Sequence, residues 1–591
     1  GTTSLTKDTV CPYCACGCSL SVDVKDNHII RSKPGNEMAV NNGTACLLGC
    51  YALDFVSSPQ RLTQPLVKVN GNLEPATWEQ ALQAATQGFK KFMEIYGSKS
   101  LAVLGSPKCP NEDNYVLQKF AWCVLGTSNI DNSSSLYSTS NFLLPSVNTG
   151  LFGATHKISE LVNADLIMIA GSDLEIAAPI LSYAVKRAVK YHGAKLILID
   201  AGENHLDYLA SLRLKPLPGT ETALLNCLSR VIVDQSLYDA DYIVHKVKNF
   251  DEFQVTLHGH LPERIEAVTG IPGDDLVRAA SFFASARNPK TLFGDDALSS
   301  SPDAAGQALI NLLVLTGNLQ KGRGGFIPVL RDSNTLGSWD MGNLTGYLPC
   351  YMDISDLHVR KSFEEHPSIN ISGKSGLNVL DIFRNTGSII KGLYIVGENP
   401  VGWMPHSTMI QDAFNKVEFL VVQDIFLSGT ARLADVVLPA CSTLEREGTF
   451  TNFEGRVQKF HPVIQPVPGC LPDWEIMVRM SQQMSLALDF NSLHDIRREI
   501  EDLVPIYRGY SNLSRTAAKS LDTQPARHQY IEGLFTGKYA FMTGQADTTK
   551  LPVSTIDEIG SEKKLTGFGT GTRTKQASRL NRTAAHSGWR E

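Results

Sequence analysis

Short apolar runs recur along the chain and alternate with segments whose apolar residues follow helical spacing. The runs are rich in valine, isoleucine and leucine and end near glycine, serine or aspartate, as buried strands of parallel sheets do. Strands are predicted at residues 100–106, 165–172, 194–201, 392–397 and 419–423. Helices are predicted at residues 182–191 and 304–315. The alternation predicts an α/β fold with doubly wound parallel sheets.

The polar residues at the strand ends are candidate ligand contacts, because open parallel sheets bind ligands outside the carboxyl ends of their strands. These ends are residues 171–173 (GSD), Asp200 and residues 397–400 (GENP). Each dipeptide alone also fits an ordinary turn, in which glycine and asparagine serve only the backbone.

Composition narrows the class of protein. The chain has 591 residues, of which 43% are hydrophobic and 19% charged, with a net charge of −6. This balance excludes a largely disordered chain and gives no reason to expect nucleic acid as a partner. No apolar run reaches the roughly 18 residues of a membrane span, and the first ten residues lack an apolar signal core. A soluble, cytoplasmic protein is therefore expected.

The end of the sequence differs in composition from the rest. Residues 563–590 contain seven Lys or Arg and no acidic residue. Composition favours a solvated tail. The alternative is a loop at residues 569–574 (GTGTRT), whose small residues would let backbone N–H groups approach a phosphate.

Cysteines are concentrated near the start of the chain. Of twelve, six lie in the first fifty residues: Cys11, Cys14, Cys16, Cys18, Cys46 and Cys50. Disulfide scaffolds are mostly small secreted domains, so metal binding is favoured here. Three clustered cysteines and one remote cysteine suit a 4Fe–4S cluster better than the paired spacing of zinc sites. The predicted ligands are Cys11, Cys14, Cys18 and Cys46, with Cys16 and Cys50 as spare thiols.

An ordered series of motifs extends over nearly the whole chain. It comprises residues 11–14 (CPYC), 111–115 (NEDNY), 126–132 (GTSNIDN), 315–318 (LTGN), 340–342 (DMG), 397–400 (GENP), 422–426 (VQDIF), 434–439 (ADVVLP) and 448–452 (GTFTN). In this order they resemble the alpha subunits of molybdenum- or tungsten-dependent formate dehydrogenases, within the molybdopterin oxidoreductase superfamily.

The resemblance implies a 4Fe–4S cluster beside molybdenum or tungsten held by two molybdopterin guanine dinucleotides. Each dinucleotide would lie across one α/β domain. The matching cofactor-binding positions are Gly171, Ser172, Asp200, Gly219, Thr220, Gly397, Glu398, Asn399, Gln423 and Asp424.

The sequence departs from the family at the metal ligand. Where the family has cysteine or selenocysteine followed by histidine, this chain has Tyr137 and Ser138. A phenol with a pKa of about 10 is a poor replacement for a soft thiolate. Serine cannot accept a proton near neutral pH as histidine can.

Other family positions also differ. Leu48 replaces a lysine between cluster and pterin, residues 201–203 (AGE) replace an arginine pair, and residues 295–301 (DDALSSS) replace a histidine region. Of the substrate-handling set only Arg331 remains, and it fits a carboxylate ligand or a structural role equally well.

The resemblance also implies the domain order. An iron–sulfur domain is expected at residues 1–58. A split α/β domain would comprise residues 59–134 and 332–505, with a second, Rossmann-like α/β domain inserted at residues 135–331. Residues 506–591 would be a shortened C-terminal pterin domain.

These departures favour a formate-dehydrogenase-like iron–sulfur subunit without formate chemistry of its own, which relays electrons or docks partners in a larger oxidoreductase complex. One alternative is an active molybdenum or tungsten bis-pterin oxidoreductase with atypical metal ligation. Another is a structural subunit whose cluster serves only folding. The expected partners are other iron–sulfur or flavin redox subunits.

Overall fold

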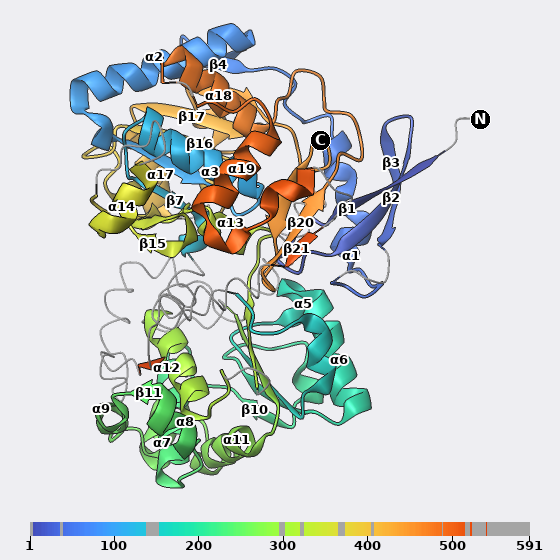
Figure 1. The fold of residues 1–591 in the computed structure, drawn as a ribbon, viewed down its shortest axis with the longest axis vertical. Coiled ribbons are helices and arrows are strands. Elements are labelled where there is room, and N and C mark those ends of the chain that lie inside the picture. Colours follow the sequence, from blue (N-terminus) through green and yellow to red (C-terminus); the bar gives the residue numbers. More distant parts are fainter. Residues whose placement is uncertain are drawn as a thin grey trace.

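The computed structural model describes residues 4–35, 40–136, 153–294, 302–319, 324–364, 373–403, 407–486, 488–514, 520–522 and 539–540. Figure 1 shows two α/β lobes along the long axis of the molecule, with a small antiparallel sheet beside the upper lobe. Each lobe is built around one of the two large sheets.

The small sheet contains the start of the chain. Its order is β1-β2-β3, with antiparallel pairing throughout. The strands are β1 (Leu5–Val10), β2 (Ser19–Lys25) and β3 (His28–Pro34), followed by the short helix α1 (Leu47–Tyr51). The Ser32 hydroxyl in β3 donates a hydrogen bond of 2.7 Å to the Gly49 carbonyl, which fixes α1 against the sheet.

The lower lobe contains a five-stranded sheet with the order β10-β9-β8-β12-β13, in which every pair is parallel. The strands are β8 (Leu166–Ala170), β9 (Lys195–Ile199), β10 (Leu212–Leu214), β12 (Pro289–Gly294) and β13 (Phe326–Val329). The strand order reverses between β8 and β12, which is the switch point where doubly wound sheets bind ligands.

Helices cover this sheet. They are α5 (Leu174–Ala177), α6 (Pro179–His192), α7 (Glu221–Asp234), α8 (Ala240–Lys246), α9 (Phe250–Thr256), α10 (Pro262–Thr269), α11 (Gly273–Ser285) and α12 (Pro302–Leu315). The core of the lobe is continuous with that of the small sheet, because buried residues such as Cys11 and Leu20 belong to the same apolar cluster as Ile197.

The upper lobe contains a seven-stranded sheet with the order β5-β4-β18-β17-β16-β6-β7. Its strands are β4 (Leu66–Val69), β5 (Asn72–Pro75), β6 (Leu101–Gly105), β7 (Ile130–Asn132), β16 (Gly392–Val396), β17 (Phe419–Asp424) and β18 (Val436–Pro439). From β7 to β18 the pairs are parallel, whereas β4 and β5 extend the sheet with antiparallel pairs. Here the order reverses between β6 and β16.

The helices of the upper lobe come from both halves of the chain. They are α2 (Trp78–Tyr96), α3 (Asn111–Lys119), α13 (Thr335–Asp340), α14 (Leu357–Glu364), α15 (Val379–Arg384), α16 (Pro400–Trp403), α17 (Thr408–Lys416), α18 (Asp473–Gln483) and α19 (Leu493–Leu503). A π-helical segment, Phe120–Val124, continues α3.

Three smaller strand groups complete the described chain. β19 (Gly448–Thr451), β20 (Arg456–Phe460) and β21 (Ser520–Asp522) form an antiparallel sheet. β11 (Val247–Lys248) pairs with β22 (Tyr539–Ala540), and β14 (Tyr347–Leu348) pairs with β15 (Met352–Asp353).

The predicted α/β fold with parallel sheets is confirmed. The five predicted strands correspond to β6, β8, β9, β16 and β17, and the two predicted helices lie within α6 and α12. The expected domain boundaries stay predictions.

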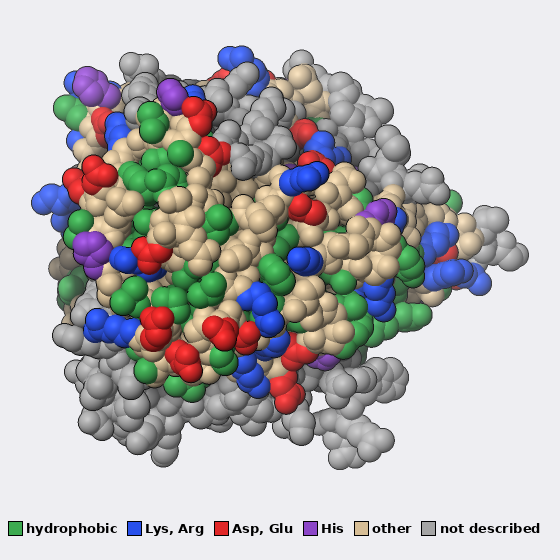
Figure 2. Space-filling view, turned by 90° about the horizontal axis from the view of Figure 1, so that it is seen from below, with side chains coloured by type: hydrophobic (Ala, Val, Ile, Leu, Met, Phe, Trp, Pro, Cys, Tyr) green, Lys and Arg blue, Asp and Glu red, His purple; other side chains and the backbone are tan. Residues whose placement is uncertain are grey.

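The surface seen in Figure 2 carries Lys and Arg interspersed with Asp and Glu over the described part of that face. Among the helices in the described ranges, none combines the length and the hydropathy that a membrane span requires.

Candidate functional site

The four predicted cluster ligands come from a loop after β1 and from the start of α1. The Cys11 backbone N–H donates a hydrogen bond of 2.8 Å to the Cys18 carbonyl, which closes the loop that carries Cys14. Cys46 directly precedes α1. The thiols act electrostatically on one another, since Cys11, Cys14 and Cys46 each contribute to the pKa shift of another thiol in the set. The predicted ligands therefore lie within electrostatic range of one another.

Two residues more than 430 positions further along the chain bind the backbone of the cysteine loop. The Asn452 side-chain amide donates to the Cys16 carbonyl at 3.1 Å, and the Gln458 amide donates to the Gly17 carbonyl at 2.8 Å. Gly17 has a φ of +71°, and a Cβ there would lie 2.0 Å from Gln458 Oε1. Both the backbone conformation and the close approach therefore favour glycine at this position.

The thiols are buried soft donors. Burial raises the pKa of Cys11 and of Cys18, whereas a hydrogen bond with the Cys16 side chain lowers the pKa of Cys14. The six cysteines of the first fifty residues are free thiols, so the disulfide alternative is not seen among them. Among the described residues, no three His, Cys, Asp or Glu side chains converge as ligands of one ion do. A 4Fe–4S cluster does not need three ligands that converge on one ion, because each of its four thiolates binds a different iron.

The switch point of the lower sheet contains Gly171 and Ser172 at the end of β8. Gly171 has a φ of +63°, and a Cβ on Gly294 at the end of β12 would lie 2.3 Å from Ser172 Cβ. Ser172 is 1% exposed, and its hydroxyl has no hydrogen-bond partner among the described residues. Two strand ends thus meet around a buried polar atom that is left without a partner.

Asp200 lies at the end of the neighbouring strand β9 and caps its own loop. Its carboxylate accepts hydrogen bonds from the Gly202 N–H at 2.9 Å and from the Asn204 amide at 3.1 Å. The second group on this edge is Gly219, with a φ of +88°, and Thr220, whose hydroxyl donates to the Leu217 carbonyl at 2.6 Å just before α7.

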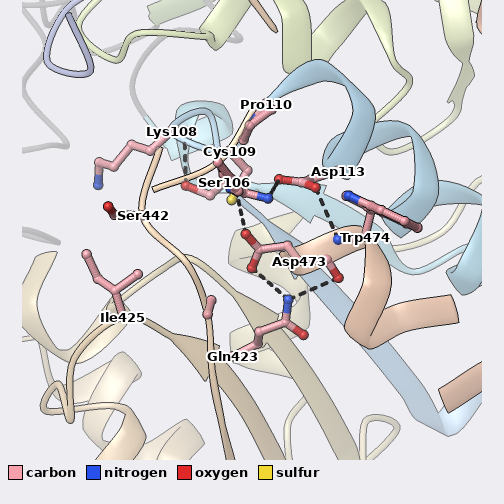
Figure 3. Close-up of polar contacts among 12 residues, drawn as sticks. Ser106, Lys108, Cys109, Pro110, Asp113, Gln423, Ile425, Ser442, Asp473 and Trp474 are labelled. Carbon is pink, nitrogen blue, oxygen red and sulfur yellow. Dashed lines mark hydrogen bonds and ion pairs between the residues drawn. The ribbon is translucent and has the colours of Figure 1, made fainter. Parts of the chain in front are cut away.

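The switch point of the upper sheet contains Gly397 and Glu398 after β16. The Glu398 carboxylate is fully buried and accepts hydrogen bonds of 2.7 Å from the hydroxyls of Ser106 and Ser133, at the ends of β6 and β7. Lys108 Nζ lies 3.8 Å from its other oxygen (Figure 3 shows Ser106 and Lys108). Burial raises the pKa of Glu398, and Lys108 opposes this shift.

Gln423, at the end of β17, faces the core. Its amide donates to Asp473 at 2.6 Å, as Figure 3 shows, and its side-chain oxygen accepts from the Tyr394 hydroxyl at 2.6 Å. Arg446 bridges Asp473 and Asp113 with ion pairs of 2.6 Å each. This buried network fixes the end of β17, and the Gln423 side chain is fully engaged in it.

Asn399 and Asp424 stabilise adjacent loops. The Asn399 side-chain oxygen accepts from the Thr430 N–H at 3.1 Å and hydroxyl at 2.9 Å. Asp424 accepts from the Ile425 N–H at 2.6 Å. Burial raises the pKa of Asp424 to about 6, against hydrogen bonding from Ser428.

Asp332 connects these regions electrostatically. It follows β13 of the lower sheet, yet its charge acts on Cys14, on Lys108 and on Glu398. Cys14 of the cysteine loop and Glu398 after β16 therefore both lie within range of the Asp332 charge. Arg331 is exposed directly beside Asp332.

Other predicted positions are less informative. Tyr137 and Ser138 lie outside the described residues, as do residues 295–301 and the segment 563–590. Leu48 is partly buried in α1.

The sequence reasoning missed Ser106, Lys108, Ser133 and Asp332. Ser106 could have been found, because it follows a glycine at the end of a predicted strand as Ser172 does. The other three depend on contacts between residues far apart in the sequence.

Comparison with known proteins identifies the family. Residues 61–483, more than half of the chain, match the molybdopterin oxidoreductase model, and residues 5–58 match the molybdopterin oxidoreductase Fe4S4 domain. The chain belongs to the molybdopterin oxidoreductase family. The N-terminal iron–sulfur domain is thereby confirmed, and the two matches support a 4Fe–4S cluster and molybdopterin with molybdenum or tungsten.

Two relatives that are formate dehydrogenases by name confirm the resemblance to that group. The chain is 34% identical over 506 residues to the F420-dependent formate dehydrogenase subunit alpha of Methanocaldococcus jannaschii, covering 85% of this chain and 74% of that protein. It is 33% identical over 534 residues to the putative formate dehydrogenase YrhE of Bacillus subtilis, covering 90% of this chain and 53% of that protein.

A solved structure shares the fold. The acetylene hydratase from Pelobacter acetylenicus superposes with a TM-score of 0.74 at 17% identity, covering 94% of this chain and 81% of that one. At this identity the likeness concerns the fold alone.

The residues of this molybdopterin oxidoreductase fit both cofactors. The thiol set has the soft donors that an iron–sulfur cluster requires. Near the strand ends, Ser172 Oγ and Ser442 Oγ are buried without a hydrogen-bond partner in the described chain, and Glu398 Oε2 has no hydrogen bond and only the Lys108 ammonium at 3.8 Å. Buried polar atoms are rarely left so, and a polar ligand along these edges would satisfy them.

Proposed function

We propose that this molybdopterin oxidoreductase is a formate-dehydrogenase-like subunit that passes electrons through its cluster within a larger redox complex, without oxidising formate itself. The observation that carries the proposal is an assembled set of free thiols together with Tyr137 and Ser138 at the ligand and histidine positions of the family. Its expected partners are iron–sulfur or flavin subunits, in the cytoplasm.

The chemistry of these positions supports the proposal. A thiolate is a soft ligand and a phenol is a weaker one that is protonated near neutral pH. Serine offers no basic nitrogen for the proton that formate oxidation releases. Arg331 could pair with a carboxylate, but the family's neighbouring histidine is absent from its place.

The chain's own residues would still serve electron transfer. When bound, a 4Fe–4S cluster carries one electron at a time, with a potential set by hydrogen bonding, burial and charge. Cys11 and Cys18 are buried, which shields the site from water. Asp332 adds negative charge near Cys14.

An active molybdenum or tungsten enzyme with atypical ligation is the second candidate. It is favoured by Ser172 Oγ at the lower switch point, which is buried without a hydrogen-bond partner in the described chain, because a degenerate pterin site would have no need to keep a polar atom buried there. Pterin binding would then survive without the family's thiolate ligand.

Metal and cofactor content of the anaerobically purified chain tests both candidates. About four irons per chain, a cluster that dithionite reduces, and no formate-dependent reduction are expected. Stoichiometric molybdenum or tungsten with formate-dependent cluster reduction would refute the proposal. Metal and pterin without formate turnover would support the second candidate, and a cluster that dithionite cannot reduce would indicate a folding role.

A further inference from the structure

The turn between β19 and β20, residues 452–455, binds the backbone of the cysteine loop. The Phe453 N–H donates a hydrogen bond of 3.0 Å to the Ala15 carbonyl. The next two carbonyls of the loop accept the side-chain amides of Asn452 and Gln458. Figure 1 shows β20 beside β1, which leads into this loop. The backbone between two of the predicted cluster ligands is therefore held by one hairpin.

The same turn binds the first described residues of the lower lobe. The Phe453 carbonyl accepts a hydrogen bond of 2.7 Å from the Ala154 N–H. The Glu454 carboxylate accepts one of 2.7 Å from the Ile158 N–H. Between these two points, the Thr155 N–H donates at 2.9 Å to the backbone of β13. The turn is thus connected to the five-stranded sheet of the lower lobe through two hydrogen bonds and one short segment.

Phe453 is the residue that both sides share. Its N–H binds the cysteine loop and its carbonyl binds the lower lobe. Its side chain is 1% exposed and belongs to the apolar cluster that contains Cys16 and Ala154. Gly153 has a φ of +90°, and a Cβ there would lie 2.9 Å from the Phe453 carbonyl oxygen. Because close-packed interiors have little free volume, a displacement on one side of Phe453 reaches the other.

Glu454 is the buried charge of this junction. Its side chain is 4% exposed, and the Arg456 guanidinium lies 4.0 Å away. Burial raises the pKa of Glu454, and the Ile158 N–H opposes this shift. A second connection, the ion pair of 3.4 Å between Lys157 and Asp522, is exposed at both ends and contributes little. The buried hydrogen bonds therefore carry most of the connection between the turn and the lower lobe.

We propose that the β19–β20 turn couples cluster occupancy of the cysteine loop to the position of residues 153–163, at the entry to the lower lobe. Thiolates bound to one cluster fix the carbonyls of residues 15–17 that the hairpin binds, whereas an empty loop leaves them free to move. This inference goes beyond the proposed function, because it holds whether or not the cluster relays electrons. Coupling of this kind is reciprocal, so a change at the entry to the lower lobe alters retention of the cluster by the same factor.

Hydrogen–deuterium exchange of the full chain tests the coupling from the cluster side. The anaerobically purified chain is compared before and after a chelator removes its iron. Peptides from residues 153–163 should exchange on the order of tenfold faster without iron, because their hydrogen bonds to the turn are weakened. Two control segments should keep their exchange rates: α11 in the same lobe and α2 in the other.

Two substitutions of one residue test the coupling from the lower lobe. Ile158→Pro removes the N–H that Glu454 accepts, at the first position of the 3₁₀ helix Ile158–Asn163, where proline is tolerated. Lys157 has the extended conformation that a residue before proline prefers. Ile158→Ala is the matched control, because it shortens the same buried side chain and keeps the N–H. Iron release to a chelator should be about tenfold faster from Ile158→Pro than from Ile158→Ala.

Three outcomes would overturn the proposal. The first is equal iron release from the two variants, and the second is exchange at residues 153–163 that does not respond to iron removal. The third is an iron-free chain in which α11 exchanges faster to the same extent, since the cluster would then stabilise the whole lobe without a specific connection. The exchange experiment uses the wild-type chain, so it decides the proposal even if Ile158→Pro does not fold. Neither measurement depends on dithionite reduction or formate turnover, which decide the proposed function.

Discussion

Gly17→Ala should loosen the cysteine loop. The residue has a φ of +71°, which costs an alanine roughly 1–2 kcal/mol. The new Cβ would lie 2.0 Å from Gln458 Oε1 and 2.9 Å from Asn452 Cβ, so the Gln458 amide must move. Its hydrogen bond to the Gly17 carbonyl is then lost in a buried site, which adds about 1–3 kcal/mol.

Gly43→Ala is the matched control in the same domain. Gly43 has a φ of +70°, and a Cβ there would meet nothing within 4 Å. Gly43→Ala therefore loses only the free energy of the strained backbone conformation. The free energies of unfolding of the two variants should differ by about 1–3 kcal/mol.

Iron content after anaerobic reconstitution and the rate of iron release to a chelator are the measurements. Gly17→Ala should hold less iron and release it faster, whereas Gly43→Ala should resemble the wild type. Gln458→Ala, introduced with Gly17→Ala, removes the clashing oxygen and should restore part of the loss. Equal iron release from the two glycine variants would refute the reasoning.

Three further outcomes are expected. Arg446→Met should lower the free energy of unfolding by about 3–5 kcal/mol, because the buried carboxylates of Asp113 and Asp473 lose their cation. Arg384→Met, which removes an exposed ion pair, should cost about 1 kcal/mol or less. Equal denaturation midpoints of the two variants would contradict this. Burial raises the pKa of Asp131 to about 6, so the native state binds the proton more tightly than the unfolded state does. The free energy of unfolding should therefore fall as the pH rises from about 4 to about 6. Asp131→Asn should show a smaller fall in Tm across this range than the wild type, and an equal fall would exclude the shift. Cys18→Ser should abolish the EPR signal and lower iron content, whereas Cys50→Ser should keep both; loss of iron in the second variant would assign the ligand to Cys50.

The strands that the sequence predicted are those with continuous apolar runs, such as residues 165–172, which contain β8. The sequence did not predict β12, because its buried Lys290 interrupts the pattern. The structure directs the Lys290 ammonium to the Gly324 carbonyl, a contact that depends on tertiary structure. The short β7 and β18 carry too few residues for a periodicity to be recognised.

The candidate site was predictable only where a motif is local. The spacing of the cysteines is enough to bring Cys11 close to Cys18. Glu398 was predicted as a contact from its motif, but its buried position between Ser106 and Ser133 depends on strands far apart in sequence. Lys108 carried no recognisable signal, since a lone lysine after a strand is common.

The cysteine loop is bound by Asn452, which follows β19, and by Gln458 in β20, and this affects the order in which the iron–sulfur domain is assembled. The hydrogen bonds from Asn452 to Cys16 and from Gln458 to Gly17 span 436 and 441 residues. During synthesis the cysteines leave the ribosome on the order of tens of seconds before these partners exist. The four thiols therefore remain exposed through most of translation, and iron delivered early would meet an open loop. Cluster insertion should be a late step in the maturation of this chain, taken once the seven-stranded sheet has closed and β20 has formed.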